Sequence, residues 1–387
     1  MNKQKLFSYF NDTIYYLTAF FPFAFGMAVC FGLTEIMGIM FACIMILFAP
    51  KTNGEKVMPL YLSFMLIGYA LSAFHGGVVF AASIICGILL IVSSFFFDKL
   101  KKLTDSPAAS GVMLATALTV TVQFTTHYFG IGATGDTVTE MIKSYISLGF
   151  HPNWRGVLYG TIVMVIMITF PRKFKKFSKT VSAPFVAIIV TLILNLFLNP
   201  SDMASAINEI PDGTLSDLYI SVSHISKLIL FLTPYANDIV AAISIGIALF
   251  ITSFYAISRN NSEKNDFIAG GIANAIGGGI FTVPLPYGIN KDKSSLIPRI
   301  SAIAVMLAVF YFCEEFILRI PLHSCAVVII VGAWQNVKWG ELKKAFGEII
   351  PFAVFIVSTV TCLALNPAYG VIIAAVISAV YSFRKAS

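Results

Sequence analysis

Apolar runs alternate with short polar connections along almost the whole chain. A membrane-spanning helix needs about 20 predominantly apolar residues, so these runs predict about twelve to fourteen spans and little soluble structure. The expected spans are 13–32, 36–49, 77–97, 106–129, 156–170, 181–198, 236–257, 266–280, 321–335, 350–365 and 368–383, with a short third helix inside 51–71 and the tenth and eleventh spans over 294–313.

One stretch, Ala269–Arg299, interrupts this apolar pattern. It begins as a helix of small apolar residues, and we expect it to break at Gly277–Gly279, pass through a short β-prone piece at Ile280–Val283, and reach the charged residues Lys291–Lys293. Irregular backbone survives at membrane depth only where it is buried in protein or lines a wet cavity. Secondary transporters build substrate sites from such interrupted helices, with a half-helix N-terminus directed at an anion.

Composition supports a membrane protein. The 387 residues are 58% hydrophobic and 12% charged, and soluble domains carry about 25% charged residues. We therefore expect an all-α polytopic membrane protein. The N-terminal sequence lacks a small-residue cleavage site, so the first apolar run is interpreted as a retained span. The connection 130–155 is expected to carry an amphipathic helix within DTVTEMIKSYISLGF.

Basic residues gather in alternate connections and at both ends of the chain. By the positive-inside rule, these clusters and both termini face the cytoplasm, which predicts a multi-pass protein of the cytoplasmic (inner) membrane. Short clusters beside apolar spans are topogenic signals, so nucleic acid is not an expected partner. The clusters contain Lys3, Lys5, Lys99, Lys101, Lys102, Arg172, Lys173, Lys175, Lys176, Lys179, Arg259, Lys264, Lys338, Lys343, Lys344, Arg384 and Lys385.

The sequence contains no pattern of catalytic or metal-binding residues. Its six cysteines are dispersed without a CxxC spacing, and its five histidines show neither pairing at i, i+4 nor an HExxH motif. The apolar spans contain no Ser/His/Asp grouping and no paired carboxylates. We therefore expect neither an enzyme nor a bound metal or cofactor, and a coupling ion is not specified.

The two halves of the chain resemble each other. SPAASGVML, at the start of the fifth span, matches IPLHSCAVV at Ile320–Val328, and the interrupted element at Lys51–Tyr61 corresponds to the break at 281–295. Seven crossings in each half would give the halves opposite orientations in the membrane. Interrupted segments at corresponding positions indicate a transport site. The expected division is 1–199 (segments 1–7), an external connection at 200–233, and 234–387 (segments 8–14).

Several motifs, in the expected order, resemble the SulP anion transporters, the superfamily of sulfate permeases, prestin and pendrin. They are TAFFPFAFGMAV, KVMPLYLSF, LTDSPAASGVMLATALTVTVQFTTHYFGIG, NDFIAGGIANAIGGGIFTVPLPYGI and RIPLHSCAVVIIVGAWQNVKWGELKKAF. The resemblance implies fourteen segments in a seven-plus-seven inverted repeat, divided into core and gate domains. It also implies an anion between the N-termini of short helices 3 and 10, each preceded by a brief β-like piece, elevator-like alternating access, and usually a homodimer.

The sequence departs from the family pattern in three places. The family normally carries a cytoplasmic STAS domain after the last span, but this sequence ends at Ser387 directly after it, so the resemblance covers the transmembrane part. Thr252 stands where the family has an eighth-span carboxylate able to bind Na⁺ or H⁺, which favours exchange or facilitated movement over cation symport. The tenth-span Arg-Ser signature corresponds to Lys293-Ser294 only with a one-residue insertion.

The candidate substrate-binding residues flank the two interruptions. Lys291 and Lys293 would supply positive potential, or else lie in a solvated turn beside Asp292. Ser294 and Ser295 would offer hydroxyl and N–H donors, or act as N-caps.

On the facing element, Met58, Pro59 and Leu60 would present backbone N–H groups, and the side chain of Tyr61 would either line the site or pack. Phe23 would form an apolar wall of the site or belong to the core. Thr252 is a candidate ligand, and Asn274 is expected to join helices through hydrogen bonds.

The leading functional hypothesis is a secondary transporter of small anions, among which the family includes sulfate, bicarbonate, chloride, oxalate and C4-dicarboxylates. One alternative is a nucleobase (uracil or xanthine) permease of the same architecture, which would use carboxylates in the second half. Another is an anion channel or a voltage-responsive motor.

Overall fold

A computed structural model describes residues 3–30, 35–48, 64–73, 76–97, 100, 106–135, 137–198, 236–258, 264–279, 296–335, 337 and 339–386. Over these residues the chain forms helices joined by turns, and they contain no β-strand. The all-α fold class predicted from the apolar pattern is therefore confirmed. The β-like pieces expected before helices 3 and 10 fall outside these ranges.

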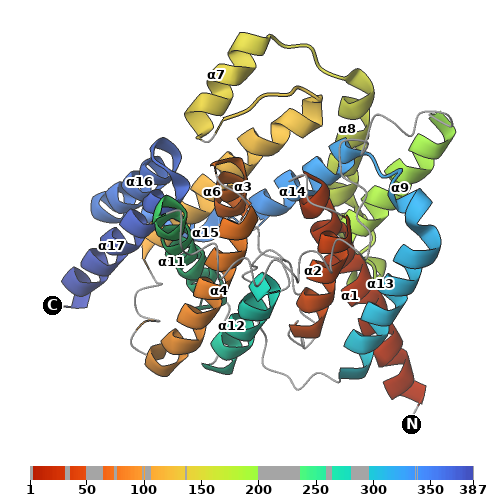
Figure 1. Ribbon diagram of the computed structural model, residues 1–387, viewed down its shortest axis with the longest axis horizontal. Helices are drawn as coiled ribbons and strands as arrows, with labels where there is room; N and C mark the ends of the chain where they lie inside the picture. Colours follow the sequence, from red (N-terminus) through yellow and green to blue (C-terminus); the bar gives the residue numbers. More distant parts are fainter. Residues whose placement is uncertain are drawn as a thin grey trace.

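The helices follow the apolar runs (Figure 1). Their bounds are α1 (Lys3–Cys30), α2 (Glu35–Phe48), α3 (Phe64–Ala73), α4 (Gly76–Ser93), η2 (Ser94–Phe96), α6 (Pro107–Phe129), α7 (Val138–Leu148), α8 (Trp154–Lys173), η3 (Phe177–Lys179), α9 (Ala183–Leu198), α11 (Ala236–Ser258), α12 (Lys264–Gly279), α13 (Leu296–Ile317), α14 (Leu322–Gln335), α15 (Trp339–Ala345), α16 (Ile349–Ala364) and α17 (Pro367–Ala386).

Helices long and apolar enough to cross a membrane occur in both halves. Among the described residues, seven meet that criterion by length and composition, and they lie within α1, α4 with η2, α6, α8, α11, α13 and α17. Shorter apolar helices lie within α2, α9, α12, α14 and α16. Such a chain is a multi-pass membrane protein, because so much apolar helix surface requires a lipid environment.

Local sequence explains where the helices around α7 begin and end. The Ser106 hydroxyl accepts a hydrogen bond from the Ala108 N–H at 3.2 Å, and Pro107 occupies the first turn of α6. Gly130 ends α6 with φ of 66°, a left-handed conformation that glycine adopts without strain. Thr137 and Glu140 form a capping box at the start of α7, which confirms the amphipathic helix expected there.

Two sequence-based expectations are corrected by the structure. One continuous helix, α13, occupies the region assigned to the tenth and eleventh spans, with a non-helical residue only at Cys313. The helix predicted to break at Gly277–Gly279 continues through Gly279. At Gly278 an added Cβ would lie 2.6 Å from the Phe80 carbonyl oxygen, so this glycine permits close packing of α12 on α4 instead of ending the helix.

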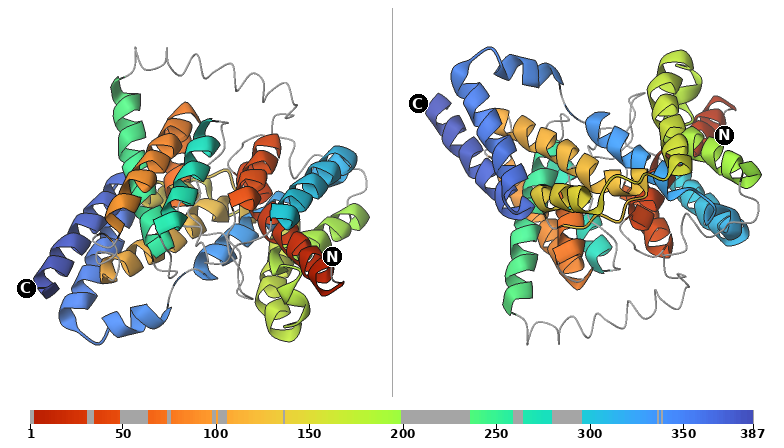
Figure 2. Two further views of the ribbon diagram at one scale, coloured as in Figure 1. Left: turned by 90° about the horizontal axis from the view of Figure 1, so that it is seen from below. Right: turned by 90° about the horizontal axis from the view of Figure 1, so that it is seen from above.

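The helices form two sets, which correspond to the expected core and gate domains (Figures 1 and 2). In the core set, α4 packs against α11 and α12, α1 packs against α2 and α13, and α2 meets α12. In the gate set, α6 packs against α14 and α16, α8 against α9 and α14, and α16 against α17.

The packing repeats between the two halves of the chain. Chain order matches α1 with α11, α2 with α12, α4 with α13, α6 with α14, α8 with α16 and α9 with α17. With this matching, the packed pair α1–α13 corresponds to α11–α4, and the pair α2–α13 corresponds to α12–α4. In the same way, α1–α9 corresponds to α11–α17, α8–α9 to α16–α17, and α8–α14 to α16–α6. Helix packing thus follows the symmetry of a two-fold inverted repeat.

Not all helix pairs follow this symmetry, and one departure lies between the core and gate sets. α1 packs extensively against α14, whereas the equivalent helices α11 and α6 show no comparable packing over their described residues. α1 and α11 belong to the core set, and α14 and α6 belong to the gate set. The core and gate are therefore closed against each other on the α1–α14 side.

The helix ends define two faces of the molecule. The ends of α1 and α6 lie with the starts of α8 and α14, since His127 contacts Cys30, Asn153 bonds to Phe129, and His323 lies against Gly156. α7 extends across this end, which we call the α7 face (Figure 1). The opposite ends of α1 and α8 carry basic residues, so we call that end the basic face.

Candidate functional site

Most of the predicted anion site lies outside the described residues. This applies to Met58, Pro59, Leu60 and Tyr61 of the first interruption and to Lys291, Lys293, Ser294 and Ser295 of the second. Their assignment as substrate-binding residues remains a prediction. The helices that follow the two interruptions, α3 and α13, are described and indicate what surrounds them.

Each of these two helices packs against a helix that carries a predicted site residue. α3, which follows the first interruption, packs against α11, and α13, which follows the second, packs against α1. The remaining site candidates belong to the packing partners, because Phe23 lies in α1 and Thr252 lies in α11. Each interruption is therefore followed by a helix that packs on the helix carrying a predicted site residue.

Phe23 and Thr252 are both buried in the protein. Phe23 is 1% exposed and belongs to the apolar core, where its neighbours Phe21 and Phe25 stack at 5.5 Å between ring centroids. Thr252 is 0% exposed, and its hydroxyl donates to the Leu249 carbonyl of its own helix at 3.0 Å. Both residues occupy core positions, and a ligand role for either remains a prediction.

Small residues and hydroxyl groups hold α4, α11 and α12 together. The Ser83 hydroxyl donates to the Asn274 backbone carbonyl at 2.9 Å, and the Cys86 sulfur lies 3.7 Å from the Ser253 hydroxyl. An added Cβ at Gly87 would lie 2.5 Å from the Gly271 carbonyl oxygen. Asn274 thus joins helices as expected, although the atom that receives the Ser83 hydrogen bond is its backbone oxygen.

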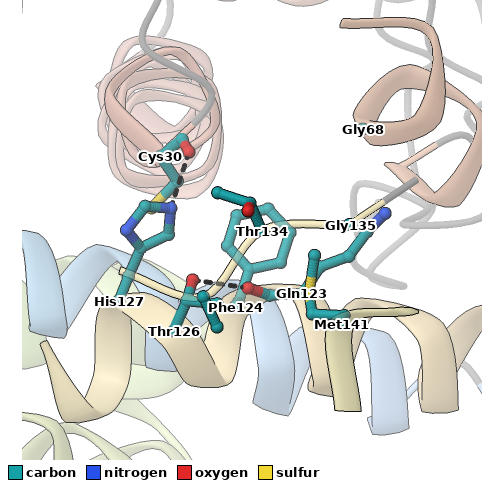
Figure 3. A pocket seen from close by; sticks show the side chains of 10 residues that line it. Cys30, Gly68, Gln123, Phe124, Thr126, His127, Thr134, Gly135 and Met141 are labelled. Carbon is teal, nitrogen blue, oxygen red and sulfur yellow. Dashed lines mark hydrogen bonds between the residues drawn. The ribbon is translucent and has the colours of Figure 1, made fainter. Parts of the chain in front are cut away.

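A pocket opens at the α7 face, where core and gate helices meet (Figure 3). Its volume is about 270 Å³. Core helices α1 and α3 contribute two lining residues, and gate helix α6 contributes four. The other four come from 133–135 and from α7. The lining residues are Cys30, Gly68, Gln123, Phe124, Thr126, His127, Ala133, Thr134, Gly135 and Met141.

Two contacts connect α6 to the core helices in this pocket. The His127 Nε2 donates to the backbone carbonyl of Cys30 at 2.9 Å. The Gln123 carboxamide faces α3, where a Cβ added at Gly68 would lie 2.9 Å from its terminal atoms. The Oε1 atom of Gln123 is buried without a hydrogen-bond partner in the described structure, so a water or solute in the pocket would satisfy it.

The lining segment 133–135 is hydrogen-bonded to α7. The Thr134 N–H donates to the Ser144 hydroxyl at 3.1 Å, and Met141 faces the cavity. Burial raises the pKa of the Tyr145 phenol, although a polar contact with Thr126 opposes this effect, so the phenol stays neutral at physiological pH. Tyr145 therefore adds no charge near the pocket.

A second histidine lies close to the pocket. His323, in the first turn of α14, is 7% exposed, and neither of its ring nitrogens has a hydrogen-bond partner among the described residues. Its ring occupies the notch left by Gly156, where an added Cβ would lie 1.5 Å from Cδ2. The sequence contained no spacing that pairs His127 with His323, because their helices meet only in the tertiary structure.

The described residues offer no site for a bound metal. No group of three or more His, Cys, Asp or Glu side chains with suitable geometry occurs among them, and all six cysteines are free. The pocket is lined by apolar groups, several neutral hydrogen-bonding groups and one imidazole. Its polar groups can form hydrogen bonds at the junction of core and gate.

Solved structures of membrane transporters share this fold. The transmembrane domain of a cyanobacterium bicarbonate transporter, BicA, aligns with a TM-score of 0.65 and 15% identity, covering 97% of this chain and 98% of that chain. A structure of SLC26A9 aligns with a TM-score of 0.65 and 11% identity, covering 98% and 66% of the two chains. The murine Slc26a9 anion transporter in an inward-facing state aligns with a TM-score of 0.69 and 10% identity, covering 100% and 69%.

Sequence comparison gives the family. No match is found among individually curated proteins. The profile of the sulfate permease family, however, matches residues 69–360, which is most of the chain and includes helices of both the core and the gate set. The family profile and the fold agree with the resemblance found in the motifs, and the chain belongs to the sulfate permease family.

Proposed function

We propose that this protein is a secondary transporter that moves small inorganic or carboxylate anions by elevator-like alternating access. As a member of the sulfate permease family it is a multi-pass membrane protein that transports anions, and it is not an enzyme. The finer proposal concerns the route and the site. The anion would lie between the N-termini of the short helices that begin near 58–61 and 291–295.

The observation that carries this proposal is the partial symmetry of the helix packing, which is broken where core and gate meet. Several equivalent helix pairs pack in both halves, but α1 packs on α2 more extensively than α11 does on α12. Between core and gate, α1 meets α14, while α11 and α6 do not pack comparably over their described residues. If the α1–α14 contact were broken and an equivalent α11–α6 contact were formed, the protein would pass from one conformation to the oppositely facing one. Such an exchange would open the central site to one side of the membrane and then to the other.

The proposed site uses two kinds of donor. Anion oxygens would bind at the positive ends of the two short helices. At the first helix, which includes Pro59, the donors would be the backbone N–H groups of Met58, Leu60 and Tyr61. At the second, they would be the hydroxyls of Ser294 and Ser295. Lys291 and Lys293 would add positive charge. Phe23 on α1 and Thr252 on α11 would lie behind these donors, because their helices pack against α13 and α3.

The proposed substrates are sulfate, bicarbonate, chloride and small carboxylates. Two of the structural relatives are described as a bicarbonate transporter and an anion transporter. Thr252 is uncharged and fully buried, so it supplies no carboxylate for a coupling cation. We therefore favour anion exchange or facilitated movement over cation symport.

The test is substrate binding followed by flux. Purified protein is screened by thermal shift against sulfate, bicarbonate, halides, dicarboxylates, uracil and xanthine, and positive anions are then measured as counterflow in proteoliposomes. We expect Lys293→Ala to lower anion affinity, whereas Lys343→Ala, an exposed change on α15, leaves affinity unchanged. Binding of nucleobases without anions would indicate a permease, and steady currents without counter-anion dependence would indicate a channel.

We also propose the orientation and assembly of the protein. The basic face would be cytoplasmic and the α7 face external, because Arg172, Lys173, Lys343 and Lys344 lie at helix ends on the basic side. Both termini would then be cytoplasmic, and the protein would form a homodimer in the inner membrane. Labelling of a single cysteine placed at exposed Ser147 from outside intact cells tests the orientation, and light scattering in detergent tests the dimer.

A further inference from the structure

A hydrogen bond joins the core to the gate at the α7 face. His127 lies on gate helix α6, and Cys30 is the last residue of core helix α1. The distance of 2.9 Å from Nε2 to the Cys30 carbonyl oxygen fits a direct bond, with the imidazole as donor. Figure 3 shows this bond at one end of the pocket.

The position of this bond favours a positive charge on His127. The last four carbonyl groups of a helix lack intrahelical partners, and together they carry the negative end of the helix dipole. Cys30 is the last described residue of α1, and α6 ends at Phe129, two residues after His127. A protonated imidazole therefore gains from the C-terminus of α6 and from a charge-assisted hydrogen bond to the Cys30 carbonyl. The same carbonyl groups make the pocket unfavourable for an anion.

The other titratable groups at this junction do not take the place of His127 as the side chain that carries the proton. Cys30 on α1 and Cys325 on α14 are buried thiols, and the Tyr145 phenol on α7 is neutral. On α7, Glu140 accepts a hydrogen bond from the N–H of Thr137 in its capping box, and on α8 Arg155 is exposed. Only neutral groups and His127 line the described pocket.

Only one of the two imidazoles, His127 and His323, carries an added proton at this junction. His323 lies at the start of α14, 7% exposed and without a hydrogen-bond partner for either ring nitrogen among the described residues. A charge on His127 opposes a second charge nearby. Because His127 has a carbonyl acceptor and His323 has none, the proton belongs on His127.

We propose that His127 is a proton-controlled latch: protonation of its imidazole strengthens the bond to the Cys30 carbonyl and holds gate helix α6 against core helix α1. Acid on the α7 side thus keeps that side closed, and deprotonation weakens the latch. The functional consequence rests on the proposed function, because it requires that core and gate separate during transport and that the α7 face is external.

The first experiment measures transport against external pH. Initial rates of anion uptake into right-side-out membrane vesicles are recorded from about pH 8 to about pH 5.5, the range in which histidine titrates, at constant internal pH. A cation at a helix C-terminus corresponds to a change of about two- to fivefold, so we expect the wild-type rate to fall by that factor. His127→Gln, which keeps a neutral donor, should show a flat profile relative to wild type.

The matched control is His151→Gln, which removes an exposed histidine from the connection between α7 and α8. It should retain the wild-type pH profile, and it also corrects for titration of the anion itself. A wild-type profile in His127→Gln would overturn the latch. An equal loss of pH dependence in both variants would do so as well.

A second measurement does not require transport. The charged latch stabilises the folded protein at low pH, and this contribution disappears as the pH rises and the imidazole loses its proton. The melting temperature of wild type should therefore exceed that of His127→Gln more at about pH 6 than at about pH 8. A constant difference would reject the latch. If no anion is transported but this difference changes with pH, the proposed function fails and the latch stands.

Discussion

Gly26 on α1 lies directly against Cys325 on α14. A Cβ built at Gly26 would lie 3.4 Å from the Cβ of Cys325 and 3.6 Å from its Cα. The absence of a side chain at position 26 lets a core helix approach a gate helix closely. This contact lies in the α1–α14 interface, which has no comparable counterpart between α11 and α6 over their described residues.

The Gly26–Cys325 contact predicts a reversible lock on transport. Disulfides join residues whose Cβ atoms are about 3.5–4.5 Å apart, so Gly26→Cys should bond to the native Cys325 on oxidation. If α1 moves relative to α14 during each cycle, the oxidised variant will lose anion flux and a reducing agent will restore it. Cys30 is replaced by alanine in this background to prevent a competing bond.

The controls for this lock are Gly26→Ser, which has a similar volume and no thiol, and Gly26→Cys with Cys325→Ala, which has no partner. Both should be insensitive to oxidant. Full flux in a completely crosslinked sample would mean that α1 and α14 stay together throughout the cycle. That result would contradict elevator movement between these two helix sets.

Gly156 should tolerate no side chain while His323 keeps its position. An added Cβ would lie 1.5 Å from Cδ2 and 1.7 Å from Nε2 of the buried imidazole. We expect Gly156→Ala to destabilise the protein by about 1–3 kcal/mol, the usual range for overpacking. Thermal unfolding of the purified protein measures this. Adding His323→Ala should recover part of the loss, and a double variant no better than Gly156→Ala would disprove the proposed clash.

Gly87 should be equally restricted, because its nearest neighbours are backbone atoms of α12. The Gly271 carbonyl oxygen would be 2.5 Å and the Ala275 nitrogen 2.6 Å from an added Cβ, so the two helices would have to separate. A loss of about 1–3 kcal/mol or more is expected for Gly87→Ala. Gly132→Ala is the matched control, since a Cβ there meets nothing within 4 Å. Similar melting temperatures for the two variants would refute the close approach of α4 and α12.

Asn195 on α9 connects α8 to the turn between α13 and α14. Its Oδ1 accepts from the Tyr159 hydroxyl at 3.2 Å, and its Nδ2 donates to the Arg319 carbonyl at 2.8 Å. Asn195→Leu leaves both partners unpaired and should cost about 1–3 kcal/mol. Tyr159→Phe removes one hydrogen bond and should cost about 0.5–1.5 kcal/mol. Chemical unfolding compares them, and a larger loss in Tyr159→Phe would contradict this network.

The apolar pattern alone was sufficient to predict the helices. A backbone in lipid must satisfy its hydrogen bonds internally, so long apolar runs form helices whatever their neighbours are. The amphipathic helix over 138–148 and the fifth span ending at Phe129 were predicted for similar local reasons. The family followed from several motifs in a fixed order, each of which is carried by neighbouring residues in the sequence.

Packing decided what local reasoning misjudged. Gly277–Gly279 read as a helix break because glycine weakens isolated helices, yet α12 continues through them since α4 packs against Gly278. The tenth and eleventh spans were predicted separately over a region that forms the single helix α13. Phe23 lies in the core, which is one of the two positions considered for it, and its role at the site remains a prediction.

The sequence by itself determined the fold class, the family and the halves of the repeat, because these depend on composition, apolar run length and local motifs. Only the tertiary structure placed His127 against Cys30, His323 against Gly156 and Gly26 against Cys325. Each of these pairs joins helices far apart in the chain, and a local pattern contains no signal for such a meeting. The physical reason is that helix formation depends on local sequence, whereas the junction of core and gate depends on which helix faces pack together.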